Sequence, residues 1–238
     1  MPFTFAHPAI IIPFKSIKRN EISMSALAIG SMTPDFEYFL RMQLTGRYSH
    51  TVEGMFVMDI PIAIVLYLIF HLLVKSPLIR NCPRYFQLRL QSLIKFQVLP
   101  YLQKNPVSFI FCLLIGIASH IIWDGFTHHD GDFVSMYDFL SMKVDGTLPL
   151  FRYLQHGSTI VGFLVIGIIF HRMPIGTESK SAINQLFWWV AIVSASILFV
   201  IRSLFGFEYY GHVVVSLISS GLVGLVVASL LVRMKIIT

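Results

Sequence analysis

The chain has 238 residues, of which 55% are hydrophobic and only 13% are charged, and its formal net charge is +6. Soluble globular domains usually carry about 25% charged residues, so this composition excludes an ordinary water-soluble domain and indicates a membrane protein. The two cysteines, Cys82 and Cys112, form no CxxC pair, which argues against a disulfide framework or a thiol redox centre.

The N-terminal segment MPFTFAHPAIIIPFK lacks a basic start and a small-residue cleavage site, so it is not expected to be a secretory signal. Residues 23–41, SMSALAIGSMTPDFEYFLR, predict a shorter helix of mixed polarity. Pro34 disfavours helical backbone in the residue before it. We therefore expect this helix to end near Thr33 and to be followed by a turn.

A helix needs about 20 mostly apolar residues to cross a bilayer. Five stretches meet or approach this length, namely residues 55–74, 107–124, 154–170, 186–204 and 211–232. The fifth repeats small residues at Ser216, Ser220 and Gly224, a spacing that lets helices pack closely in lipid. The sequence therefore predicts an all-α, multi-pass transmembrane bundle that forms a single membrane-embedded domain over residues 1–238.

Two connections differ in character from these spans. Residues 75–104 are basic and amphipathic, which predicts a segment lying on the membrane surface. Residues 125–153 are polar, and Gly131 and Gly146 are the expected turn points.

Five spans assign the intervening segments alternately to two sides of the membrane. The side with the N-terminal segment receives eleven of the twelve acidic residues and seven of the nine histidines. Only Glu178, His71 and His171 fall on the other side, which also carries the basic residues of 75–104. Basic segments favour the cytoplasmic face. The histidine- and aspartate-rich face is therefore expected to point away from the cytoplasm at the cell membrane.

The second span ends in ASHIIWDGFTHHDGD, where ionisable residues gather. His120, Asp124 and His128 follow one another at four-residue intervals, so a helix places them on one face with a drift of about 40° per step. Two such groups one turn apart can hold one cation, as the histidines of HExxH do. We expect Gly125 to fray the helix, so that His128 reaches back from a turn. Imidazole with carboxylate suits zinc, manganese or iron.

Other polar residues on the same side are candidates to complete a metal site. They are His7 beside a proline, Asp35 after a proline, His50 just before the first span, Asp59 one turn inside that span, and His156 at the start of the third. Buried titratable groups also form hydrogen-bonded networks that hold no metal, so this alternative stays open.

The segments MPFTFAHPA, IGSMTPDFEYFLR, SHTVEGMFVMDIP and ASHIIWDGFTH resemble an uncharacterised bacterial family of small multi-pass membrane proteins that begin MPFTxxHPA. This likeness covers most of the chain. The chain also has a more distant likeness to bacterial membrane-bound metal-dependent hydrolases. The likeness lies in the order of its motifs, which are His, Pro-Asp, Ser-His and then His-x3-Asp with a further His. Those hydrolases in turn resemble the zinc-dependent phospholipase C and S1/P1 nuclease group, which are all-α enzymes with clustered zinc ions.

The distant likeness implies a set of ligands for a divalent metal, most simply zinc. These ligands would be His7, Asp35, His50, His120, Asp124 and His128. It further implies that Asp124 bridges two metals, or that Asp35 takes a proton from the attacking water. The chain departs from the phospholipase pattern because Ile160 stands where a Glu follows the histidine equivalent to His156. No freed N-terminal amine is expected either, so one or two metals are expected rather than three.

The sequence thus favours a metal-dependent hydrolase that acts on a phosphodiester or other ester at the membrane surface. Asp35 and Asp59 are the candidate catalytic carboxylates. The expected partners are membrane lipid and a lipid-like or phosphoester substrate, and no nucleic-acid module is visible. One alternative is an ion-handling or transport protein, which is disfavoured because the charges gather at one end of the spans and the sequence has no internal repeat. The other alternative is a non-catalytic membrane scaffold.

Overall fold

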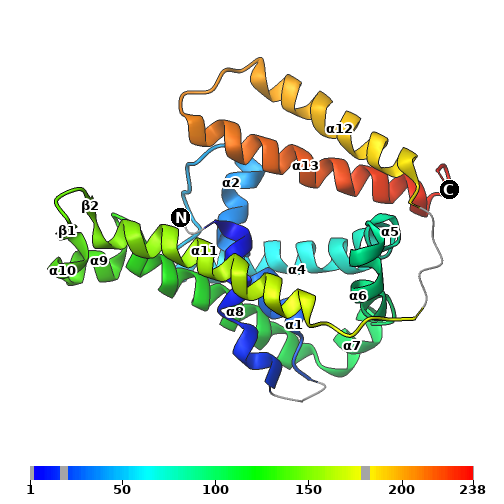
Figure 1. The fold of residues 1–238 in the computed structure, drawn as a ribbon, viewed down its shortest axis with the longest axis horizontal. Coiled ribbons are helices and arrows are strands. Elements are labelled where there is room, and N and C mark those ends of the chain that lie inside the picture. Colours follow the sequence, from blue (N-terminus) through cyan, green and yellow to red (C-terminus); the bar gives the residue numbers. More distant parts are fainter. Residues whose placement is uncertain (1–2, 17–20, 178–182, 238) are drawn as a thin grey trace. The chain divides into compact units, whose positions relative to one another are not determined.

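The computed structural model of the protein describes residues 3–16, 21–177 and 183–237 (Figure 1). Within these residues the fold is all-α except for one hairpin, in which strand β1 (Lys143–Val144) pairs antiparallel with β2 (Leu148–Pro149). Five helices of the described part are long and apolar enough to cross a membrane, which confirms the predicted multi-pass helical architecture. They are Val52–Asn81, Pro106–Thr127, Leu150–His171, Gln185–Ser203 and Tyr210–Arg233. Glu178, the one acid predicted on the second side, lies outside the described residues.

The chain divides into two compact units. The first unit consists of Met1–Asp35, Tyr48–Ala63 and Asn105–Arg172, and the second of Phe36–Arg47, Ile64–Lys104 and Met173–Thr238. The single domain predicted over residues 1–238 stays a prediction.

The first unit begins with short helical segments. These are the 3-10 helices η1 (Thr4–Ala9) and η2 (Ile12–Ser16), the helix α1 (Met24–Gly30) and the 3-10 turn η3 (Thr33–Asp35). The Ser23 side chain caps α1 by accepting a hydrogen bond from the Ala26 amide at 3.1 Å. Pro34 lies in η3, after the end of α1, so the predicted interruption of this helix is confirmed.

Two spans of the first unit, α8 (Pro106–Thr127) and α11 (Leu150–His171), are joined through α9 (Asp132–Met136), α10 (Asp138–Ser141) and the hairpin. The expected fraying at Gly125 is wrong, because α8 continues regularly to Thr127. The reason is tight packing: a Cβ at Gly125 would lie 2.8 Å from the Phe133 ring, which stacks on Phe126 with centroids 4.0 Å apart. Gly146 has a φ of 75° and forms the predicted turn in the hairpin.

Helices α1 and α8, labelled in Figure 1, pack against each other at two glycines. A Cβ at Gly30 would lie 2.5 Å from the Leu113 carbonyl oxygen, and one at Gly116 would overlap the Leu27 carbonyl oxygen. Only glycine permits such a close approach of two backbones. The crossing fixes the position of the next turn of α8, where His120 lies.

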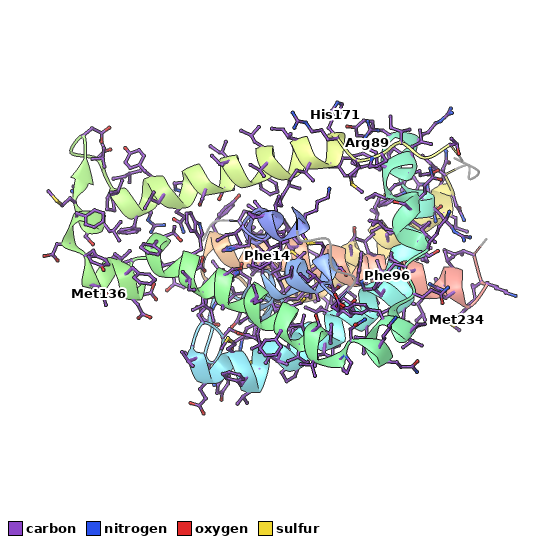
Figure 2. All side chains as sticks on the ribbon, turned by 90° about the horizontal axis from the view of Figure 1, so that it is seen from below. Phe14, Arg89, Phe96, Met136, His171 and Met234 are labelled. Carbon is purple, nitrogen blue, oxygen red and sulfur yellow. The ribbon has the colours of Figure 1, made fainter. Side chains whose placement is uncertain are left out.

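The first span is built from several helical segments in succession. They are α3 (Val52–Gly54), the π-helix η4 (Met55–Asp59), α4 (Ile60–Leu68), the π-helix η5 (Ile69–Val74) and α5 (Lys75–Asn81). The helix of the first span continues into the predicted surface segment as α5, whose place at the membrane surface stays a prediction. Its Lys75 is buried, donates to the Phe96 carbonyl oxygen at 2.8 Å and lies over the Phe96 ring (labelled in Figure 2), so its charge does not end the helix. The helices α6 (Arg84–Ile94) and α7 (Val98–Lys104) follow.

In the second unit, α12 (Gln185–Ser203) and α13 (Tyr210–Arg233) lie side by side (Figure 1). A Cβ at Gly224 would overlap the Ala191 carbonyl oxygen, and the hydroxyl of Ser216 donates to the Met42 carbonyl oxygen at 3.1 Å. Met42 directly follows α2 (Phe36–Arg41). The predicted small-residue stripe therefore packs against two neighbouring segments.

Candidate metal centre

Four side chains of the first unit converge on one point. Each of Asp35, His50, His120 and Asp124 offers one ligand atom, and these atoms all lie within 4.8 Å of one another. Asp35 ends η3, His50 precedes the first span, and the other two lie one turn apart on α8. Asp35 and His120 have no exposed surface, and Asp124 is 5% exposed. The structure thus confirms that distant parts of the chain meet at this buried polar cluster.

The separations within this group of four match those of a metal-ligand set. His120 Nε2 lies 3.2 Å from Asp124 Oδ2 and 3.6 Å from Asp35 Oδ1. His50 Nε2 lies 3.4 Å from Asp124 Oδ2, 3.7 Å from Asp35 Oδ1 and 3.3 Å from His120 Nε2. Ligands at zinc–nitrogen and zinc–oxygen distances of 2.0–2.2 Å stand roughly 3.3–3.6 Å apart around a tetrahedral ion. Five of the six separations among the two nitrogens and two oxygens are therefore close to those between ligands of one ion, and the sixth, between the two carboxylate oxygens, is at most 4.8 Å.

The His120 ring is fixed by a backbone contact. Its Nδ1 lies 2.8 Å from the Ser31 carbonyl oxygen, which can only accept, so Nδ1 carries the hydrogen and donates. In the neutral ring, Nε2 then presents its lone pair to the group of four. Metal-ligating histidines commonly donate their other ring N–H in this way. Because Ser31 directly follows α1, the glycine crossing of α1 and α8 sets this tautomer.

The carboxylates carry buried acceptor atoms that suit a cation. Asp35 Oδ2 accepts a hydrogen bond from the Thr4 hydroxyl at 2.6 Å. By contrast, Asp35 Oδ1 and both side-chain oxygens of Asp124 are buried, and among the described residues they face imidazole nitrogens at 3.2–3.7 Å without a hydrogen bond of good geometry. Burying such oxygens costs free energy unless charge or a donor compensates. The donor set and these oxygens therefore fit a divalent cation held by the group of four.

Thr4 is a contact that the sequence reasoning missed. It lies three residues before His7 in η1, and residues at this spacing share one face of a 3-10 helix. Both side chains consequently point toward the same pair of aspartates. The available signal was the spacing in TFAH, but a threonine in an apolar segment is too common to single out.

His7 borders the group of four without belonging to it. Its Nε2 lies 3.5 Å from Asp124 Oδ1, and its ring stacks on His120 with centroids 3.8 Å apart and an interplanar angle of 17°. Burial, together with the neighbouring His120, lowers the pKa of His7 to about 3, so this imidazole is neutral at pH 7. Asp124 therefore faces His120 and His50 with Oδ2 and His7 with Oδ1, and its predicted bridging of two metals stays a prediction.

His50 occupies an unusual backbone conformation. Its φ is 69°, a left-handed value that is uncommon outside glycine and often marks functional positions. Burial opposes protonation of its ring, but the carboxylates of Asp124 and Asp35 outweigh burial and raise its pKa to about 10. In the absence of a metal, a proton is therefore held between His50 and the two carboxylates at neutral pH.

Zinc binding to the metal-free protein is expected to release at least one proton at pH 7.5, because His50 must lose its proton to become a ligand. The release should fall as the pH approaches 10, where His50 of the metal-free protein is half deprotonated. Isothermal titration calorimetry in buffers of different ionisation enthalpy measures it. Wild-type binding that releases no proton at pH 7.5 would contradict the assignment of His50 as a ligand.

The other predicted site residues lie outside the group of four. His128 directly follows the end of α8, as predicted for a turn residue. Its Nδ1 lies 3.1 Å from the backbone oxygen of Asp124 and 3.6 Å from Asp124 Oδ2, so His128 borders the group of four. His156 is exposed on α11, and Asp59 is buried at the end of η4. Roles for His156 as a ligand and for Asp59 as a catalytic residue stay predictions.

A family model described as "Domain of unknown function (DUF4184)" matches residues 1–230. The chain belongs to this family. The match includes η1, all four residues of the converging group, four spans and most of the fifth, in agreement with the predicted membership of an uncharacterised family. Comparisons with curated proteins and with solved structures find no match. The more distant likeness to metal-dependent hydrolases therefore rests on the sequence motifs alone.

Proposed function

We propose that this DUF4184 protein is a membrane-bound, metal-dependent hydrolase that acts on a phosphodiester or other ester at the membrane surface. The observation that carries the proposal is the convergence of Asp35, His50, His120 and Asp124 at ligand-like separations in a buried place. The order of these residues along the chain adds support through its likeness to zinc-dependent phospholipases and nucleases.

The place of the group along the spans fits a substrate near the lipid headgroups. His50 lies two residues before the first span, and Asp124 lies three residues before the end of α8. A midplane position would require about ten residues of helix on each side. The basic residues of 75–104 support an orientation in which this end faces away from the cytoplasm at the cell membrane.

A divalent cation, most simply zinc, would supply the Lewis acidity that stabilises charge on an ester oxygen and generates a nucleophile from water near pH 7. The protein's own residues would fix the ligands. Thr4 orients Asp35, the Ser31 carbonyl group orients His120, and neutral His7 faces Asp124. Because Asp35 Oδ1 faces the group of four, Asp35 suits the role of ligand, which leaves Asp59 as the other predicted carboxylate for proton transfer.

The test combines metal analysis with hydrolysis by the purified full-length protein. Zinc-loaded protein is expected to hydrolyse bis(p-nitrophenyl) phosphate or p-nitrophenyl butyrate, to lose this activity on chelation and to regain it with zinc. His120→Ala should lose both metal and activity, whereas His129→Ala, at an exposed position nearby, should keep both.

The rival functions give different results in the same assay. Stoichiometric metal without hydrolysis of any ester tested would favour an ion-handling protein. A folded wild-type protein that binds no metal would favour a non-catalytic scaffold and would overturn the proposal.

A further inference from the structure

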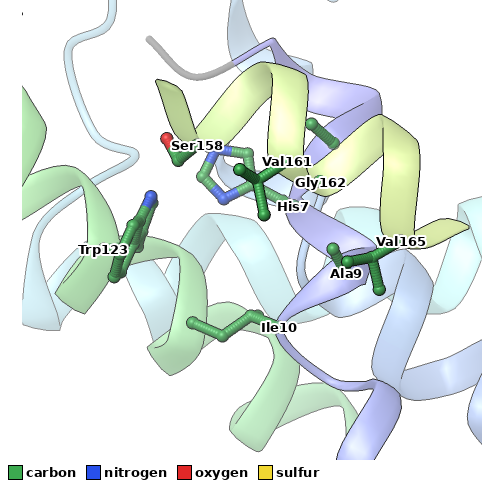
Figure 3. A pocket seen from close by; sticks show the side chains of 9 residues that line it. His7, Ala9, Ile10, Trp123, Ser158, Val161, Gly162 and Val165 are labelled. Atoms are coloured by element: carbon green, nitrogen blue, oxygen red, sulfur yellow. The ribbon is translucent and has the colours of Figure 1, made fainter. Parts of the chain in front are cut away.

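An apolar cavity of about 230 Å³ adjoins the group of four (Figure 3). Its walls come from η1, α8 and α11, which all belong to the first unit. Most of the lining is aliphatic or aromatic, with His7 and Ser158 as the polar side chains. Apolar cavities of about 150 Å³ inside proteins stay dry and bind hydrophobic molecules. This cavity is partly open rather than enclosed, and its almost wholly apolar lining suits hydrocarbon.

The cavity follows the axis of a membrane span. Ser158, Val161, Gly162 and Val165 of α11 line it, and their spacing of three, four and seven residues places them in one stripe. A stripe of this length covers about 10 Å of helix at 1.5 Å per residue. Since α11 crosses the membrane, the stripe runs in the direction in which lipid chains are ordered.

The cavity is reachable from the hydrocarbon region. Val161 is 58% exposed and Ile10 is 40% exposed, although both line the cavity. Along the same helix, Ile160 and Leu164 are also exposed, as expected of side chains that contact lipid. A lipid chain could therefore enter sideways from the bilayer, a route that a water-soluble ester would not use.

His7 joins the cavity to the candidate metal centre. The labelled His7 lies at the cavity between Trp123 and Val161 (Figure 3). The same ring stacks on His120, and its Nε2 lies 3.5 Å from Asp124 Oδ1. A molecule whose chain fills the cavity thus has one end beside the metal ligands.

We propose that this cavity binds the hydrocarbon chain of a membrane amphiphile, which makes the substrate of the hydrolase a lipid-like ester or phosphodiester. The chain site rests on the cavity, and its assignment to a substrate rests on the proposed function. Gly162 supports the geometry, because a Cβ there would lie 2.9 Å from the Ala6 carbonyl oxygen and would push η1 away from α11.

Photolabelling of the zinc-loaded full chain tests the chain site. The probe is a phosphatidylcholine with a diazirine midway along one chain, placed in phosphatidylcholine nanodiscs, and mass spectrometry maps the labelled residues. Label is expected on Trp123 and the segment Ala6–Ile10. Val165→Phe should reduce this label several-fold by filling the cavity, whereas Leu164→Phe, on the exposed face of the same helix, should not.

Two arms separate a failure of this inference from a failure of the proposed function. Labelling should persist in metal-free wild-type protein, since none of the four converging residues lines the cavity. For the zinc-loaded protein, Val165→Phe should raise the KM for a long-chain ester but not for bis(p-nitrophenyl) phosphate.

Label confined to exposed positions such as Ile160, with no effect of Val165→Phe, would overturn the chain site even if short esters are hydrolysed. Cavity labelling without any hydrolysis would refute the substrate assignment alone.

Discussion

Replacement of Asp124 with asparagine is expected to lower the zinc affinity by at least about 100-fold. Loss of a residue that only supports a metal ligand lowers the affinity by up to about 100-fold, and loss of a ligand itself should cost at least as much. Asp124 offers Oδ2 to His120 and His50 and Oδ1 to His7. Asparagine keeps the shape but loses the charge and one acceptor. Competition with a chromogenic chelator measures the affinity.

The matched control for Asp124→Asn is Asp130→Asn, which changes an exposed acid six residues further along the chain. Zinc at 100 times its Kd should stabilise the wild type and Asp130→Asn by about 2.7 kcal/mol and should leave Asp124→Asn almost unchanged. Thermal unfolding with and without zinc reports this difference. If Asp124→Asn bound zinc as tightly as the wild type, Asp124 would not be a ligand.

Replacement of Gly116 with alanine is expected to destabilise the protein by about 1–3 kcal/mol, because the added Cβ would overlap the Leu27 carbonyl oxygen and approach the Ser31 amide nitrogen at 2.7 Å. Helix α1 would have to move away from α8. The Ser31 carbonyl oxygen would then leave His120, so zinc affinity should fall as well although Gly116 touches no metal. Thermal unfolding and chelator competition measure the two effects.

Gly167→Ala provides the control for this helix crossing. A Cβ at Gly167 on α11 meets nothing within 4 Å, so the better helix propensity of alanine should make this change neutral or stabilising by up to about 1 kcal/mol. Opposite signs for the two substitutions would identify the crossing as the cause. Unchanged zinc affinity in Gly116→Ala would show that the crossing does not position His120.

The positions of the spans could be predicted because they depend on local composition. Residues 107–124 were predicted for a helix that runs over Pro106–Thr127, and 211–232 for one that runs over Tyr210–Arg233. The pair His120 and Asp124 was predictable for the same reason, since four-residue spacing puts two side chains on one helix face. The differences lie at the helix ends: α8 continues past Gly125, which packs against Phe133, and the helix of the first span continues past the buried Lys75.

The convergence of Asp35 and His50 with α8 depends on packing, which periodicity does not reveal. Asp35 and His50 were suggested only by the likeness to known metal sites. The structure shows the crossing of α1 and α8 at two glycines that accompanies their approach to α8. His7 and His128 border the group of four, and their predicted roles as ligands stay predictions. The left-handed backbone of His50 and the hydrogen bond from Thr4 to Asp35 likewise arise only in the folded chain.

X-ray absorption spectroscopy at the zinc edge of the loaded protein tests the central claim most directly. The structure predicts nitrogen and oxygen ligands at about 2.0–2.2 Å, with outer-shell scattering from two imidazoles, of which His50→Ala and His120→Ala should each lose one. A spectrum with sulfur ligands, or with oxygen ligands alone, would contradict the assignment of Asp35, His50, His120 and Asp124 as the metal centre.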